Sequence, residues 1–503
     1  WKLRINEWTR PFIPRGDKMR KICCLIIGIL LLTTISFGEI LGADGGVKDD
    51  YTYQEVLFIT GKPILVEGTL DIRGNTYTYT LENTKEKVKV TRRLTFARDV
   101  EDKLDRNQRF ITTSLDRFNE RIVVGSDRYN LEDFQYSKSI VYDCCPAVDF
   151  YSGNMEGKKI YSINGKQGQV CVDMHSDTLV GYEHKWGASE THIVQQKIHS
   201  ERKTGGEEDE KEVEWDGMVT LKFSSTDRKD ITYIENKPTE ISFRGGFLQT
   251  EKQENILQYT YDMPNVKEEG SPADRKRIKG KGDLHMDSVP INQRLVLPNL
   301  KDISGHWAEE SIDRLYSLEV FDEASPFFGP KLPMTRAAFA KAMVKAITIT
   351  EEDIRKPRRS RKEPEEISPF KDVEVKDVCY PYIKKVNEKG IMQGISPEAF
   401  MPDGILTRAQ AITIMIRALG LEGRAPSPPY RTGFIDDEAI PYWAKDAIYV
   451  AHEIGLVRGD SNGYVEPNQT MSKAEAATFI DRFLQHIREE ITVDYRERII
   501  NHY

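Results

Sequence analysis

The pattern of hydrophobic and polar positions divides the chain into unlike parts. One continuous apolar run, Ile22–Ile35, comes first. Between residues 50 and 262, short runs rich in Val, Ile, Thr, Tyr and Phe alternate with turn residues such as those at Gly61–Pro63. This alternation is typical of antiparallel strands with one buried face, so we expect a β-rich region there, either a sandwich or a barrel. After residue 298 the apolar positions recur with helical spacing, and residues 263–295, with proline, glycine and mixed charge, are expected to form a linker. The pattern therefore predicts a multidomain protein.

The first apolar run has the surroundings of an export signal. Arg20 and Lys21 stand directly before it, and the run is shorter than the ~20 residues that a membrane-spanning helix needs. A basic segment, a short apolar core and small residues afterwards are typical of a secretory signal peptide. We therefore interpret residues 19–43 as a signal peptide and residues 1–18 as upstream sequence. Export follows from this interpretation, with no stable membrane insertion after signal cleavage.

The helical part contains the same order of landmarks three times. Each unit opens with an apolar residue two positions before an aspartate, continues into an amphipathic first helix, and reaches a proline five residues before a hydroxyl residue. The hydroxyl residues are Thr335, Thr407 and Ser472. Such self-similarity is the signature of a repeat architecture. The units are expected at residues 298–348, 366–422 and 431–487, each as helix, loop and helix.

The start of each second helix is marked by a capping residue. Thr335, Thr407 and Ser472 are the expected N-caps, and Gln410 and Glu475 complete capping boxes three positions later. Apolar residues behind the caps recur at helical spacing, so these helices are expected to pack against the first helices and against neighbouring repeats.

A residue with left-handed backbone is expected directly after each first helix. Gly390 and Gly455 occupy this position in repeats two and three. Repeat one has Glu319 there instead, so we expect its turn to close differently.

Three tandem units with this order of landmarks resemble S-layer homology (SLH) domains. The matching motifs are F-x-D or its equivalent, an HWA-type start of the first helix, F-x-P, and a T-R-A-E-type start of the second helix. The resemblance covers about 298–487 and implies an α-helical, pseudo-threefold bundle with grooves between repeats. It also implies non-covalent attachment of an exported protein to the bacterial cell wall. The implied partner is an anionic, often pyruvylated, secondary cell-wall polysaccharide, a polymer linked to peptidoglycan.

Three cations follow the N-caps at the first helical position. They are Arg336, Arg408 and Lys473. We expect each to lie beside exposed backbone N–H groups at the helix start and to form an anion site with them. A cation there opposes the helix dipole, so helix stability does not explain it. Lys473 lacks the guanidinium fork and ranks below the two arginines as a ligand contact.

Further candidate contacts with the polysaccharide are two tryptophans, three aspartates and two glycines. They are Trp307 and Trp443; Asp302, Asp372 and Asp436; and Gly394 and Gly459. The tryptophans either offer flat faces to a sugar ring or fill the core, and the aspartates either accept sugar hydroxyls or cap the first helices. Glu323 stands where repeats two and three have glycine, and Val378 replaces the tryptophan in repeat two. At least one groove is therefore expected to be weak or silent.

Composition and charge narrow the possible functions. The chain has 503 residues with 72 Lys+Arg and 80 Asp+Glu, a formal net charge of −8. Its mean hydropathy of −0.54 excludes a polytopic membrane protein, and its acidic balance argues against a nucleic-acid partner. Residues 355–362 include six basic residues, which form a solvated loop or add non-specific attraction to an anionic polymer. An acidic chain must otherwise hold such a polymer through a few well-placed cations.

The β-rich region offers little recognisable chemistry. It has none of the common hydrolase, metalloprotease or nucleotide-binding motifs. Four histidines fall close together in the sequence and either form a metal site or lie on polar faces of adjacent strands: His175, His184, His192 and His199. One disulfide between Cys171 and either Cys144 or Cys145 is feasible in an oxidising exterior.

The favoured interpretation is a non-enzymatic protein of the bacterial cell surface, with no cofactor, metal or catalytic residue assigned. One alternative is an SLH-anchored extracellular hydrolase of polysaccharide or peptide, with catalysis in the β-rich region. Another is a subunit of an S-layer lattice. The role of residues 50–262 decides between the three.

Overall fold

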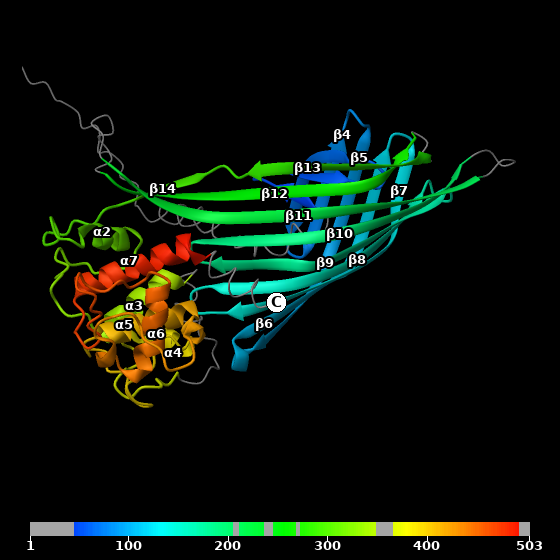
Figure 1. The fold of residues 1–503 in the computed structure, drawn as a ribbon. Helices are drawn as coiled ribbons and strands as arrows, with labels where there is room; N and C mark the ends of the chain where they lie inside the picture. The colour runs from blue at the N-terminus through cyan, green and yellow to red at the C-terminus, as the bar shows by residue number, and fades with distance from the viewer. Residues whose placement is uncertain (1–44, 205–210, 236–244, 268–271, 349–365, 492–503) are drawn as a thin grey trace, which may run out of the picture. The chain divides into compact units, whose positions relative to one another are not determined.

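The computed structural model describes residues 45–204, 211–235, 245–267, 272–348 and 366–491 (Figure 1). The predicted upstream sequence and signal peptide lie outside the described residues, as does the basic stretch 355–362. A β-rich part comes first along the chain and a helical part follows it, in the predicted order.

The β-rich part is one antiparallel meander rather than two stacked sheets. Its strands are β1 (Gly46–Lys48), β2 (Tyr53–Leu57), β3 (Ile64–Arg73), β4 (Thr76–Asn83), β5 (Val88–Lys103), β6 (Gln108–Val124), β7 (Asp127–Cys144), β8 (Asp149–Ile163), β9 (Gly168–His184), β10 (Gly187–Thr204), β11 (Lys211–Ile234), β12 (Gly246–Val266), β13 (Pro272–Asp287) and β14 (Ile291–Leu295). Strands β1 to β13 pair in chain order, and β14 pairs with the first part of β12. The sandwich alternative is therefore wrong.

Strand β1 contacts β12 and β13 near the other end of the meander, so the curved sheet is nearly closed (Figure 1). The side-chain amide of Asn255 in β12 donates a hydrogen bond to the backbone carbonyl of Lys48 in β1 at 2.7 Å. Beyond β2, the ring of Phe58 lies 5.7 Å from that of Tyr259 in β12. Alternate residues of the strands are buried, as the two-residue period of the sequence predicts. The barrel alternative is the nearer description.

The prediction of a linker at 263–295 is wrong. Strand β12 continues to Val266, and β13 and β14 occupy much of the remaining segment. The sequence misleads here because β13 is exposed along most of both faces and carries Arg275, Lys276 and Arg277 in succession. It pairs along one edge with β12 but lacks the apolar alternation that marks a half-buried strand.

The helical part consists of two helices for each repeat. They are α2 (Glu309–Ser317) and α3 (Arg336–Ile347), α4 (Tyr380–Glu388) and α5 (Arg408–Leu419), and α6 (Tyr442–Glu453) and α7 (Lys473–Glu489). The second helix of each repeat contacts the first helix of another: α3 contacts α4, α5 contacts α6, and α7 contacts α2. Among the described residues, no helix has both the length and the apolar character needed to cross a membrane.

The predicted N-caps of the second helices are confirmed. The hydroxyls of Thr335, Thr407 and Ser472 accept hydrogen bonds from the backbone N–H three residues later, and α5 and α7 have complete capping boxes. The expectation for Glu319 is wrong. It adopts the left-handed backbone of Gly390, with φ of 58° against 69°, so the turn closes alike in both repeats.

Candidate functional site

The starts of the three second helices are joined by a closed ring of backbone hydrogen bonds. The backbone N–H of Met334 donates to the carbonyl of Met471, Met471 donates to Leu406, and Leu406 donates to Met334, at 2.8 to 2.9 Å. Each of the three segments thus donates one bond and accepts one. The ring holds the first helical positions, with their cations, in fixed relation to one another.

The backbone N–H groups at these helix starts are already used. Arg336 N–H donates to the carbonyl of Gly404 at 2.9 Å, and Ala337 N–H donates to that of Pro402 at 2.9 Å. The equivalent groups of α5 and α7 donate to another repeat in the same way: Arg408 to Gln469, Ala409 to Pro467, Lys473 to Leu332 and Ala474 to Pro330. The expectation of exposed N–H groups is therefore wrong, and an anion at these positions must be held by side chains.

Arg336 of repeat one extends into repeat two. Its Nε donates to the carbonyl of Phe400 at 2.9 Å and a terminal nitrogen donates to the carbonyl of Gln393 at 2.7 Å. The guanidinium lies 4.8 Å from the centre of the Phe400 ring, and the residue is only 7 % exposed. Burial lowers the pKa of Arg336 below its ordinary value, and the nearby Asp372 carboxylate acts against this shift.

Arg408 of repeat two makes the equivalent contacts with repeat three. Its Nε donates to the carbonyl of Val465 at 2.8 Å, and its guanidinium lies 5.2 Å from the ring of Phe479. One terminal nitrogen also lies 3.2 Å from Glu475 Oε1. The sequence predicts only a capping role for Glu475, because its place in the T-R-A-E-type motif gives no signal of this second contact.

Lys473 of repeat three completes the cycle on repeat one. Its ammonium lies 4.7 Å from the centre of the Phe328 ring and 2.7 Å from Glu323 Oε2. Glu323 replaces the glycine of the other two repeats, so a carboxylate of the chain itself neutralises this cation. The prediction of a weak or silent groove is consistent with this ion pair.

The three motif aspartates hold the loop that contains the F-x-P motif. Both carboxylate oxygens of Asp372 accept backbone hydrogen bonds, from Phe400 at 2.9 Å and from Met401 at 2.6 Å. Asp302 accepts from Phe328 and Gly329, and Asp436 from Val465 and Glu466. Burial raises the pKa values of Asp302 and Asp372, but the backbone donors, with Lys473 near the first and Arg336 near the second, outweigh it and bring both below the ordinary value.

The alternative role of these aspartates as helix caps is wrong. The N-caps of the first helices are Ala308, Cys379 and Pro441, none of which makes a side-chain capping bond. Contact between the aspartates and a sugar stays a prediction. Their backbone bonds leave further lone pairs on oxygens that already have a structural function.

Both motif tryptophans are exposed, so the alternative that they fill the core is wrong. Trp307 is 66 % exposed and Trp443 is 54 % exposed. Val378, the equivalent of Trp307 in repeat two, is also exposed. Exposed indole rings are unusual in a folded domain and offer apolar faces with a polar N–H edge, a combination suited to a sugar ring.

The two candidate glycines are required by the packing of their own loops. A Cβ atom at Gly394 would lie 2.5 Å from the carbonyl oxygens of both Ser396 and Ala399. Gly459 has φ of 76°, and a Cβ atom there would lie 3.0 Å from the Phe434 ring. Both positions therefore need glycine for the local backbone, whether or not a ligand binds nearby.

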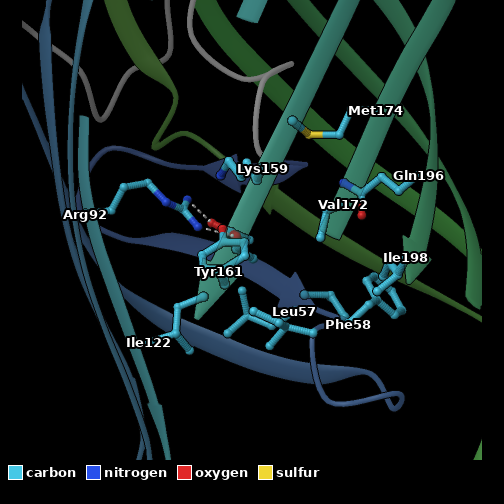
Figure 2. Close-up of a pocket in the computed structure, with 13 residues that line it drawn as sticks. Leu57, Phe58, Arg92, Ile122, Lys159, Tyr161, Val172, Met174, Gln196 and Ile198 are labelled. Atoms are coloured by element: carbon cyan, nitrogen blue, oxygen red, sulfur yellow. Dashed lines mark hydrogen bonds and ion pairs between the residues drawn. The ribbon is translucent and has the colours of Figure 1, made fainter. Parts of the chain in front are cut away.

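The inner face of the β-rich part contains a buried ion network beside a cavity (Figure 2). Arg92 in β5 lies 2.8 Å from Glu55 and 2.6 Å from Glu120, and Lys159 in β8 lies 3.1 Å from Glu120. These side chains are at most 6 % exposed. The adjoining cavity has a volume of about 440 Å³, including space open to solvent. Its other lining residues are mostly apolar, such as Met174, and include Gln196. Opposite charges pair with one another throughout this buried network, which gives it a structural role.

The four histidines that are close in sequence do not form a common site. His184 and His192 are buried, whereas His175 and His199 are partly exposed and pair with carboxylates of their own, at 2.8 Å to Asp177 and 2.9 Å to Asp216 respectively. Within the described residues, no group of three or more His, Cys, Asp or Glu side chains is arranged to hold a metal ion.

The proposed disulfide is also wrong. Cys144, Cys145 and Cys171 are all free thiols. Cys144 pairs with Asp149 at the start of β8, whereas Cys171 pairs with Ile160 near its other end. Eleven positions along a strand separate the two sites, which corresponds to ~35 Å at ~3.3 Å per residue.

Comparison with known proteins agrees with the repeat architecture. Residues 299–340, 369–412 and 434–477 match the family model of the S-layer homology domain. The C-terminal region therefore carries three tandem SLH domains, as the motifs predict. Together with the S-layer proteins among its relatives, these domains indicate a protein of the cell surface, anchored to the cell wall.

The similarity to individual proteins covers only part of each. An endoglucanase of Bacillus sp. (strain KSM-635) is 30 % identical over 26 % of this chain, which is 13 % of that protein. The surface-layer 125 kDa protein of Lysinibacillus sphaericus is 27 % identical over 41 % of this chain and 16 % of its own length. S-layer protein EA1 of Bacillus anthracis is 26 % identical over 35 % of this chain and 19 % of its own length. The chain thus spans less than a fifth of each of these relatives.

Proposed function

We propose that the three SLH domains form a pseudo-threefold bundle that binds an anionic, pyruvylated secondary cell-wall polysaccharide in the grooves between repeats. The ring of backbone bonds through Met334, Leu406 and Met471 supports the threefold arrangement. The observation that carries the binding proposal is that each motif cation extends from its own repeat onto the F-x-P loop of another. A carboxylate bound there contacts both repeats at once.

The groove that contains Arg408 has the most complete set of contacts. Repeat three, whose loop Arg408 contacts, supplies the exposed Trp443 and the loop glycine Gly459. The Arg336 groove has Gly394 but Val378 in place of a tryptophan. The Lys473 groove has Trp307, but Glu323 lies 2.7 Å from the ammonium, whereas Glu475 contacts a single terminal nitrogen of the Arg408 guanidinium, at 3.2 Å. We therefore rank Arg408 first, Arg336 second and Lys473 last.

Co-sedimentation with cell-wall sacculi tests this ranking. The whole protein is mixed with purified sacculi, with and without prior removal of pyruvyl groups, and the bound fraction is measured. Arg408→Ala is expected to weaken binding most and Lys473→Ala least, with Arg431→Ala, an exposed arginine of repeat three, as the control. Unchanged binding of an Arg336→Ala/Arg408→Ala double variant, or equal binding to depyruvylated sacculi, would contradict the proposal.

An anchored hydrolase is the second candidate, because one relative is an endoglucanase and another is the exoglucanase XynX of Acetivibrio thermocellus. The β-rich part would then carry the catalytic residues. Assay of the whole protein against soluble and wall polysaccharides tests this candidate. Turnover that survives Arg336→Ala and Arg408→Ala would separate catalysis from anchoring.

A further inference from the structure

Repeat three contains a second hollow whose lining includes none of the motif cations. It lies between the end of α6 and the second half of α7 and has a volume of about 640 Å³, including space open to solvent. Its charged and polar lining residues are Arg458, Arg482, Gln485, His486 and Glu490. Both arginines are exposed. Two guanidinium groups therefore face one hollow.

Repeat one has a lysine and an aspartate at the positions equivalent to the two arginines. Lys345 is the equivalent of Arg482, since each lies ten residues after the N-cap of its helix. Asp322 is the equivalent of Arg458, since Asp322 directly precedes Glu323 and Arg458 directly precedes the matching Gly459. In repeat one, Lys345 Nζ lies 2.7 Å from Asp322 Oδ2, and Lys341 also pairs with this carboxylate. A salt bridge thus occupies the position in repeat one that is equivalent to the hollow of repeat three.

Repeat two also pairs its cation at this position. Arg417, the equivalent of Arg482, lies 2.6 Å from Glu422 Oε1. In repeat three, by contrast, an arginine replaces the acid of repeat one. Among the described residues, neither Arg458 nor Arg482 forms an ion pair. Two like charges beside one hollow repel each other unless an anion joins them.

The other charged groups at the hollow do not remove this excess. Glu490 Oε2 lies 3.2 Å from His486 Nδ1, so its carboxylate already has a partner. The end of α6 contributes the partial negative charge of a helix C-terminus, which is about half a unit charge and does not neutralise two guanidinium groups. Arg458, Arg482 and Glu490 together carry a net charge of +1.

We propose that this hollow of repeat three binds an oxyanion, either a phosphate or a carboxylate group. The planar forks of Arg458 and Arg482 suit such a group because each offers two parallel N–H donors. The side-chain nitrogen of Gln485 donates to Glu489 Oε2 at 3.0 Å, so its amide oxygen is the polar group offered to hydroxyls next to the anion. The site is independent of the groove proposal, since it uses none of Arg336, Arg408 or Lys473.

The repeat-one salt bridge supplies the test. Arg458→Asp in the whole protein places an acid opposite Arg482, as Asp322 stands opposite Lys345. Inorganic phosphate and pyruvate are titrated separately by calorimetry at constant ionic strength, and the two arms distinguish the two sources of oxyanion. We expect Arg458→Asp to weaken binding of the preferred anion at least tenfold while thermal stability is kept or raised. Arg431→Asp is the control for net charge and is expected to bind as the parent does.

Several outcomes would overturn the site. If the parent binds neither anion, or if Arg458→Asp and Arg482→Gln both bind as the parent does, the hollow is not an oxyanion site. The groove proposal is judged separately, because Arg408→Ala is expected to reduce sedimentation with sacculi and leave the Arg458-dependent titration unchanged. Loss of that titration in Arg408→Ala would place the oxyanion in the groove and contradict the second site.

Discussion

Glu323 of the first repeat and Lys473 of the third, 150 positions apart in the chain, form an ion pair of 2.7 Å. Lys473 is the third of the motif cations, and Arg336 and Arg408 face loops that have glycine in place of Glu323. The three repeats thus share a backbone arrangement but differ in the charge of the loop residue near each motif cation. Lys473 thus faces a carboxylate supplied by another repeat's loop, whereas the carboxylate beside Arg408, at 3.2 Å, is the capping Glu475 of α7.

Replacing Glu323 by glycine is expected to strengthen wall binding. The change frees Lys473 and restores the residue that the other repeats have at this position. Because exposed ion pairs contribute ~1 kcal/mol or less, we expect a gain of up to about fivefold in affinity for sacculi, reduced by added salt. Glu398→Gly, which removes another ion-paired loop glutamate, is the control. A Glu323→Gly variant that binds no better than the control would show that Lys473 does not contribute even when free.

Truncation of the tryptophans separates binding from folding. Trp443→Ala is expected to leave the unfolding midpoint of the protein unchanged, because the side chain is 54 % exposed. Its affinity for sacculi is expected to fall about fivefold or more, as for an aromatic anchor at an interface. Trp307→Ala is expected to have a smaller effect, since its groove contains the Glu323 ion pair. Tyr442→Ala, the exposed neighbour in α6, serves as control. Equal losses in Tyr442→Ala and Trp443→Ala would count against a specific platform.

The features predicted correctly from the sequence are local or repeated ones. The caps Thr335, Thr407 and Ser472 depend on contacts within four residues, and the three units are recognisable because each contains the others' landmarks. Arg458 and Arg482 can likewise be recognised from the sequence by comparing the repeats. Alignment of the repeats places Asp322 and Lys345 at those positions and reveals the change of charge.

The features that the sequence did not reveal depend on distant residues. The backbone N–H of Arg336 donates to Gly404, and that of Phe400 donates to the Asp372 carboxylate. Both hydrogen bonds join segments that only the packing of repeats or loops brings together. The single meander in place of a sandwich is equally invisible, because alternation in a strand tells which face is buried but not which strand lies beside it. Strand β13 was missed because its cations hide the pattern altogether.

The backbone hydrogen bonds that Asp302 and Asp372 accept predict how the stability of the helical part responds to acid. The pKa values of Asp302 and Asp372 are lower in the folded protein than their ordinary value. Their contribution to stability is therefore complete above the ordinary carboxyl pKa of about 4 and is lost as the pH falls through the lowered folded values. Thermal unfolding, followed by circular dichroism between neutral pH and about pH 3, should show the helical transition weakening over this range.

A neutral substitute identifies the groups responsible for that acid response. Asp302→Asn/Asp372→Asn is expected to lower the helical unfolding temperature at neutral pH and to flatten its dependence on acid. Asp403→Asn, an exposed aspartate of the same loop as Met401, is expected to follow the parent. A double variant with the parent's full acid dependence would assign that dependence to other carboxylates.

The buried network of the β-rich part predicts a large effect of a single substitution. Arg92→Met removes the cation that lies between Glu55 and Glu120, whose side chains are 3 % and 0 % exposed. Both buried carboxylates would then lose the guanidinium that pairs with them, and breaking a buried pair in this way lowers the free energy of unfolding by about 3–5 kcal/mol. Urea unfolding of the whole protein measures the change. Arg73→Met, at an exposed arginine paired with Asp71, is the control and is expected to change stability by less than ~1 kcal/mol. A loss in Arg92→Met no larger than in the control would show that Glu55 and Glu120 are protonated or hydrated rather than held by the arginine.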